Sequence, residues 1–155
     1  VMKSAGYKTA IAGKWQINDF RIHPDALINH GFDDFCMWTG GETDLTSNEH
    51  SLKSDQRYWD PYIHTSEGSK TYKRQFGPDI YNSFILDFIS NHKDQPFFIY
   101  YPMLLVHDPF VPTPDSPEWN SLETRSEKNN RFFVDMVAYM DKIIGKIVNE
   151  LSTQG

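Results

Sequence analysis

The 155-residue sequence carries a net charge of −6, and 39% of its residues are hydrophobic and 15% aromatic. This length allows one hydrophobic core, and the apolar and aromatic content excludes a disordered polymer. The acidic balance argues against a duplex nucleic-acid binder, because such proteins neutralise phosphates with clusters of Lys and Arg. The single cysteine, Cys36, excludes an internal disulfide, and no stretch approaches the roughly 18 apolar residues of a membrane span.

The chain opens on a helix end and a strand. Residues 1–6 are typical of the last turn of a helix capped by Gly6, and no charged-then-apolar leader precedes them. We therefore expect an internal fragment without a visible signal peptide. Residues 7–15 predict a short buried strand that includes Thr9 and Ile11. This strand delivers Lys14 at its exit, where a rigidly held ammonium is suited to meeting an anion.

Residues 16–31 predict a loop, and residues 32–38 predict a second strand, ended by Gly40 and Gly41. The segment from about 42 to 75 is polar and weakly patterned, with one aromatic knot at 58–62. We expect it to be an excursion on the surface of a larger body, and a hairpin is one form it could take.

The second half of the chain predicts a helix, a buried strand, a stiff loop and a final helix. Gly77-Pro78-Asp79 is a good helix start. Residues 97–101 form a continuous apolar run of the kind buried on both faces of a parallel sheet, and a helix followed closely by such a strand indicates an α/β fold. Four prolines stiffen residues 107–119. The apolar positions expected on the first helix are Ile80, Phe84, Ile85, Phe88 and Ile89. Those expected on the last helix, before a capping Gly155, are Phe133, Met136, Val137, Met140, Ile144, Ile147, Val148 and Leu151.

Two residues stand out as candidates for chemistry. A lone lysine is usually a solvated surface residue, but Lys14 follows a strand and could hold a sulfate or phosphate oxygen. His107 lies in the proline-rich loop that follows the buried strand predicted at 97–101. Side chains at such strand ends point into the ligand crevice of an α/β sheet. His107 could protonate a leaving alkoxide or hold an anionic oxygen, although a structural histidine is the ordinary alternative.

Other reactive residue types are expected to be structural. Cys36 lies in an apolar strand and is interpreted as a core residue. Asp33 and Asp34 are adjacent in a strand, so they point to opposite faces and would not converge on one metal ion. We expect them to be solvated or to cap. The aromatic residues Tyr58, Trp59 and Tyr62 could stack on a sugar, but such residues more often anchor loops. No ligand spacing links the remaining histidines, His23, His30, His50, His64 and His92.

Several ordered segments carry a family resemblance. They are Ala5-Gly6-Tyr7 through Gly13-Lys14-Trp15, His30-Gly31-Phe32-Asp33, Pro96 through Pro102, and His107-Asp108-Pro109-Phe110. Together they resemble the sulfatase family of the alkaline-phosphatase-like superfamily, and the chain looks closest to bacterial arylsulfatase-A-like enzymes. The resemblance implies an α/β sandwich with a mixed, mostly parallel sheet flanked by helices. It also implies that residues 1–155 are the central portion of the catalytic domain.

The resemblance assigns roles to three residues. Lys14 and His107 match positions that contact the substrate sulfate and assist catalysis. Gln16 stands where the family usually has a histidine, so its amide can bind an anion but cannot donate a proton in catalysis. The family uses calcium and a formylglycine made from cysteine in a Cys-x-Pro-Ser-Arg setting, which Cys36 lacks. The resemblance therefore places the nucleophile and the Ca²⁺ ligands outside this chain.

The parent protein is thus expected to hydrolyse sulfate esters, with a sulfated glycan as one substrate class, and the isolated chain is expected to be inactive. Family likeness also suggests export to the periplasm or secretion. Three alternatives stay open: a phosphodiesterase or phosphonate hydrolase of the same superfamily, a non-catalytic binder of sulfated glycans, and a self-contained interaction module. An aryl sulfate or a small alkyl sulfate also remains open as substrate.

Overall fold

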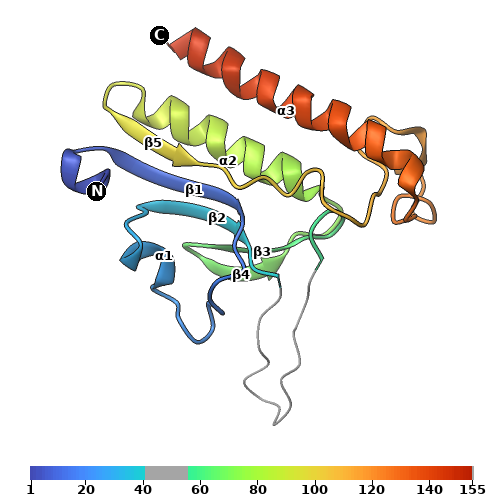
Figure 1. Ribbon diagram of the computed structural model, residues 1–155, viewed down its shortest axis with the longest axis horizontal. Coiled ribbons are helices and arrows are strands. Elements are labelled where there is room, and N and C mark those ends of the chain that lie inside the picture. Colours follow the sequence, from blue (N-terminus) through green and yellow to red (C-terminus); the bar gives the residue numbers. More distant parts are fainter. Residues whose placement is uncertain (41–55, 155) are drawn as a thin grey trace.

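The computed structural model describes residues 1–40 and 56–154, which form a five-stranded sheet with helices on both faces (Figure 1). The strand order is β4-β3-β2-β1-β5. The mixed α/β architecture expected from the sequence is confirmed. The parallel strands are β1 (Lys8–Lys14), β2 (Asp34–Trp38) and β5 (Phe97–Tyr100), and the antiparallel additions are β3 (Tyr62–Thr65) and β4 (Gly68–Thr71).

Two long helices form successive layers over one face of the sheet. Helix α2 (Gly77–His92) begins at the predicted position, with Pro78 in its first turn, and packs on β1. Helix α3 (Phe133–Gln154) packs on α2 as the outer layer (Figure 1). A short 3₁₀ turn, η3 (Asn130–Phe132), leads into α3. The main core lies between these layers and includes Ala12, Cys36, Trp38, Ile85, Ile89 and Met136.

The opposite face of the sheet is covered by the segment that follows β1. It contains a single helical turn, α1 (Ala26–Asn29), inside the region expected to be loop. Its buried residues form a second core with Ile11, Phe35 and Met37 of the sheet. Successive side chains of β1 point to opposite faces of the sheet, and Ile11 and Ala12 therefore belong to different cores.

The N-terminal end and the proline-rich loop each have a short 3₁₀ turn. The N-terminal turn η1 (Lys3–Ala5) ends at Gly6, whose φ of +85° and N–H bond to the Lys3 oxygen confirm the predicted cap. The turn η2 (Pro117–Asn120) lies within the loop after β5. Predictions for residues 41–55, including His50, and for Gly155 lie outside the described residues. Among the residues described, no helix is both long and apolar enough to cross a membrane.

Two expectations about the burial of the strands are corrected. Residues 62–71 form the hairpin β3–β4, but β3 extends the main sheet and is not a surface excursion, since Tyr62 and Ile63 are buried. Strand β5 is an edge strand in the described sheet, and it is not covered on both faces. Phe98 and Tyr100 stay 36% and 51% exposed, because α2 covers only the face of Phe97 and Ile99.

The buried stripe of α3 also differs from the prediction. Met136 is buried as expected, but its buried companions are Tyr139 and Ile143. The Tyr139 hydroxyl donates to both carboxylate oxygens of Asp79 on α2, at 2.8 and 3.0 Å, which fixes this rotation of α3. Several predicted stripe residues are consequently exposed, namely Phe133, Ile144, Val148 and Leu151.

Candidate functional site

Lys14 lies at the exit of β1, on the face of the sheet that carries α2. It is the last residue of β1 and the register partner of Trp38, the last residue of β2. Alternation along the strand places its side chain on the same face as Ala12. The side chain is half-buried, and none of the ion pairs among the described residues includes it. Lys14 is therefore a positioned cation with no described carboxylate counter-ion.

Gly13 brings the loop after β5 against this strand exit. Its φ is +115°, and a Cβ at this position would lie 2.2 Å from the Pro102 carbonyl oxygen. The same oxygen accepts a hydrogen bond of 2.7 Å from the Lys14 backbone N–H. Only glycine combines this backbone conformation with so close an approach. The segment that leads to His107 is thereby attached beside Lys14.

His107 has a defined ring orientation. Its Nδ1 lies 2.7 Å from the Asp108 backbone oxygen and 2.9 Å from Asp108 Oδ1, and both atoms are acceptors. We therefore assign a proton to Nδ1, which donates to Asp108. Arg57 Nη1 can only donate, so in this tautomer it lies 2.9 Å from Nδ1 without a hydrogen bond to the ring, and it donates instead to the Asp108 backbone oxygen at 3.2 Å. This assignment leaves Nε2 for a ligand, and the side chain is 49% exposed.

Arg57 joins the two predicted site residues and was not predicted from the sequence. Its guanidinium carbon lies 4.4 Å from the ring centroid of Trp38, the register partner of Lys14. The same guanidinium contacts His107 Nδ1. Arg57 therefore bridges the end of β2 and the loop after β5. Its position next to the aromatic residues at 58–62 could have indicated a structural or functional role. The polar composition of the surrounding segment predicted a surface excursion instead, so Arg57 was not placed beside the sheet.

Tyr58 holds the backbone of the His107 loop in place. Its hydroxyl lies 2.7 Å from the His107 oxygen and 2.9 Å from the Leu104 oxygen, and it can donate to either. It also accepts a bond of 3.2 Å from the His107 N–H. Burial raises the pKa of Tyr58 to about 12, so the hydroxyl stays neutral and keeps its donor proton near neutral pH. Tyr58 anchors a loop, as the sequence indicated for such residues.

Gln16 lies two residues beyond Lys14, with its side chain against Gly40. A Cβ at Gly40 would come within 2.7 Å of Gln16 Nε2. Gln16 is exposed, and no hydrogen bond among the described residues joins it to Lys14 or His107. It borders the strand exits without completing the Lys14–Arg57–His107 arrangement.

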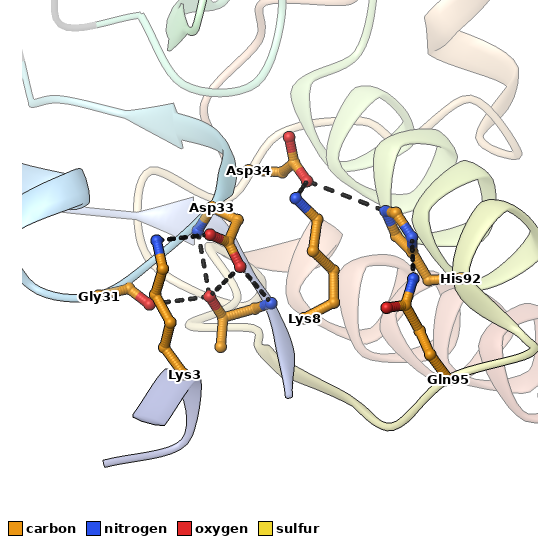
Figure 2. Close-up of polar contacts among 8 residues, drawn as sticks. Lys3, Lys8, Gly31, Asp33, Asp34, His92 and Gln95 are labelled. Carbon is orange, nitrogen blue, oxygen red and sulfur yellow. Dashed lines mark hydrogen bonds and ion pairs between the residues drawn. The ribbon is translucent and has the colours of Figure 1, made fainter. Parts of the chain in front are cut away.

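The two adjacent aspartates lie where β2 begins, at the end of the strands opposite Lys14, and Figure 2 shows their contacts. Asp33 Oδ2 accepts bonds of 3.0 Å from the Thr9 N–H and hydroxyl, and Asp33 Oδ1 lies 2.6 Å from Lys3 Nζ. Burial raises the pKa of Asp33, but the bonds from Lys3 and Thr9 outweigh it and lower the pKa to about 2. Asp34 pairs with Lys8 at 3.1 Å. Both carboxylates are part of the scaffold, which goes beyond the expected solvated or capping role.

The remaining reactive residue types are also occupied by packing. Cys36 is 2% exposed, and burial raises the pKa of its thiol to about 12, so it belongs to the core as predicted. His64 is buried between Phe20 and Phe35, and its Nδ1 lies 2.9 Å from Ser69 Oγ. Across residues 1–40 and 56–154, no group of three His, Cys, Asp or Glu side chains could hold a metal ion.

The family assignment follows from a match over the whole chain. The sulfatase family model matches residues 1–155. The chain belongs to the sulfatase family.

Solved structures share the fold of this sulfatase segment. The structure of Ps i-CgsB superposes with a TM-score of 0.69 at 17% identity, covering 97% of this chain and 35% of that one. Its complex with k-i-k-neocarrahexaose gives a TM-score of 0.63 at 18% identity, covering 99% and 35%. The Bacteroides thetaiotaomicron protein BT33336S-sulf, from work on glycosaminoglycan metabolism, gives 0.65 at 20% identity, covering 98% and 41%. The sulfatase segment therefore spans well under half the length of these chains.

Proposed function

We propose that the protein containing this chain hydrolyses sulfate esters, with Lys14 and His107 acting on the sulfate group. The observation that carries the proposal is the pairing of these residues through Trp38 and Arg57 at one end of the sheet. Membership of the sulfatase family supports the reaction class. Three cationic or ionisable side chains, Lys14, Arg57 and His107, lie at this end of the sheet and suit an anionic substrate better than a neutral one.

Lys14 acts in this proposal as a fixed point charge. Its ammonium neutralises the sulfate oxygens as negative charge shifts during cleavage of the ester bond. The rigid strand and the Gly13–Pro102 contact hold its backbone before substrate arrives. Since no described carboxylate competes for the ammonium, its charge is available to the sulfate.

His107 acts through Nε2. In the doubly protonated ring, Nδ1–H donates to Asp108 while Nε2–H faces the ester oxygen. As a nucleophile from outside this chain bonds to sulfur and the bond between sulfur and the ester oxygen breaks, the proton of Nε2 moves to the departing alkoxide and yields the alcohol. Asp108 Oδ1 stabilises the charged ring and fixes its orientation.

Calcium and formylglycine enter this proposal through the family resemblance alone. The described residues do not fit a calcium site, and Cys36 is too buried to act as a nucleophile. We assign neither group to a described residue, and we derive no step through them. The isolated segment 1–155 is accordingly expected to show no turnover.

A sulfated glycan is the proposed substrate class, and export is the proposed location. One structural neighbour is complexed with a carrageenan-type oligosaccharide, k-i-k-neocarrahexaose, which supports a glycan over a small alkyl sulfate. Gln16 favours the second candidate function, a protein that binds sulfated glycans without cleaving them. Its amide offers a hydrogen bond and no transferable proton where the family usually has a histidine.

The experiment compares hydrolysis of an aryl sulfate and the matching aryl phosphate by the full-length protein and by Lys14→Ala. We expect the sulfate to be preferred, and the substitution to lower kcat/KM by about a hundredfold, the effect of removing one charge-stabilising donor. Lys146→Ala on α3 is the control, because it removes an exposed lysine distant from the strand exits. A preference for phosphate would favour a phosphodiesterase. Binding of sulfated glycan without any turnover would favour the non-catalytic alternative.

A further inference from the structure

A basic cavity of about 210 Å³ lies next to the contact between Arg57 and His107, and neither Lys14 nor His107 is among its described lining residues. Its walls come from the segment before β3, the proline-rich loop and the stretch before η3. They include the cations Arg57, Arg125 and Lys128, and no carboxylate is among the described lining residues. The chain as a whole has 21 acidic and 15 basic residues. A cavity lined by three cations is therefore locally basic in a chain that is acidic overall.

Arg125 is held in place by aromatic rings. Its guanidinium carbon lies 4.0 Å from the ring centroid of Trp59 and 5.3 Å from that of Trp119. The two indoles pack edge to face at 4.9 Å, and Arg125 Nε donates to the Ser121 oxygen at 3.3 Å. Neither Arg125 nor Lys128 belongs to an ion pair among the described residues. A guanidinium fixed in this way keeps its terminal N–H groups for an external anion at a low entropic cost.

Arg57 places this cavity beside the proposed reaction centre. It lines the cavity and also contacts His107 Nδ1 at 2.9 Å. An anion bound at Arg125 would therefore lie within one side chain's reach of a substrate at His107. The neighbouring Arg131 differs sharply, because it is already paired with Glu118 at 3.0 Å and Glu127 at 3.1 Å.

We propose that the cavity of Arg57, Arg125 and Lys128 binds a second anionic group of the substrate, a sulfate or carboxylate on the sugar being processed or on its neighbour. This inference rests on the proposed function and specifies its substrate as polyanionic. Guanidinium groups match the two oxygens of sulfate or carboxylate. The volume is below the roughly 300–1,000 Å³ of drug-sized sites, so it suits one substituent or one sugar. Trp59 adds an aromatic wall for the ring.

The test uses the full-length protein and three disaccharides with the same scissile sulfate. One carries no other charge, the second carries another sulfate, and the third carries a uronate carboxylate. Arg125→Gln should lower kcat/KM tenfold or more for a substrate with the second anion, about the effect of losing a charge-assisted bond. Hydrolysis of the singly charged substrate should change less than twofold. Arg125→Lys should restore part of the difference, since it keeps the charge, and Lys146→Gln is the charge-matched control.

The doubly charged substrates identify the preferred group. A loss confined to the disulfated disaccharide assigns the cavity to sulfate, and a loss confined to the uronate assigns it to carboxylate. An equal loss for all three disaccharides, or no loss for any, overturns the proposal while leaving the sulfatase function standing. If no ester is hydrolysed at all, calorimetric binding of the same disaccharides decides. A tenfold weaker affinity of Arg125→Gln for the doubly charged ones alone supports the cavity, and equal affinities overturn it.

Discussion

Strands β1 and β2 have charged residues at both ends, and the two ends differ in how those charges are compensated. Where the strands begin, Lys3 pairs with Asp33 at 2.6 Å and Lys8 pairs with Asp34 at 3.1 Å (Figure 2). Where they end, Lys14 has no described ion pair, and Arg57 lies on the Trp38 ring without one. Compensated charges hold the sheet together, whereas uncompensated cations remain available to a ligand. The comparison thus separates scaffold from site on the same two strands.

The largest effect is expected from removing the acid–base group at the end of the sheet where the cations are uncompensated, which we call the open end. His107→Asn should lower kcat/KM of sulfate ester hydrolysis by about a thousandfold, within the range typical of losing general acid catalysis. The melting temperature should change little, because the side chain is 49% exposed and its backbone contacts to Tyr58 remain. Steady-state kinetics with His23→Asn, an exposed histidine, as control checks this. A loss smaller than tenfold would remove His107 from the proposed chemistry.

The next largest effect is expected on stability, from a substitution that disturbs the contact between Gly13 and Pro102 at the open end. Gly13→Ala should lower the free energy of unfolding by about 3 kcal/mol or more, because the residue has a positive φ and its Cβ would overlap the Pro102 oxygen. Gly31→Ala is the matched control, since Gly31 has a φ of +92° but no atom within 4 Å of the added Cβ. It should cost only about 1 kcal/mol, the strain of the backbone alone. Urea unfolding measures both, and equal losses would contradict the role of the Pro102 contact.

Local sequence patterns were sufficient to predict most elements of the fold. The Gly6 cap, the strand that ends at Lys14 and the start of α2 at Pro78 each depend on a few neighbouring residues. The buried face of α3 does not depend on neighbouring residues alone. The hydrogen bond between Tyr139 and Asp79 joins residues 60 positions apart and fixes which side of the helix is buried. Strand β5 similarly shows that an apolar run predicts a strand, but not which of its faces is covered.

The candidate site was predictable only in part, for a related physical reason. Lys14 ends β1 and His107 lies in the loop that follows β5, a local pattern that sequence can reveal. Arg57 and Arg125 acquire their roles from partners far along the chain, His107 and Trp59 respectively. No periodicity marks such residues. The status of Asp33 was equally hidden, since its Thr9 and Lys3 partners precede it by more than twenty positions.

The smallest effect, at the compensated end, discriminates between two neighbouring aspartates. Asp33→Asn should lower the free energy of unfolding at pH 7 by about 1–2 kcal/mol, discounted from the pKa shift for partial solvent screening. Asp34→Asn should cost about 0.5 kcal/mol or less, because the side chains of Lys8 and Asp34 are 30% and 41% exposed.

The contribution of Asp33 to stability should also depend on pH. Since the pKa of Asp33 falls from 3.8 to about 2 on folding, the carboxylate stabilises the fold fully above pH 3.8, and this stabilisation disappears as pH falls from 3.8 to about 2. The difference between wild type and Asp33→Asn in urea unfolding should therefore persist at pH 5 and shrink towards zero near pH 2. A difference that stayed constant over this range would show that the Asp33 carboxylate does not stabilise the fold through its charge, and the contrast between the two strand ends would then rest on the open end alone.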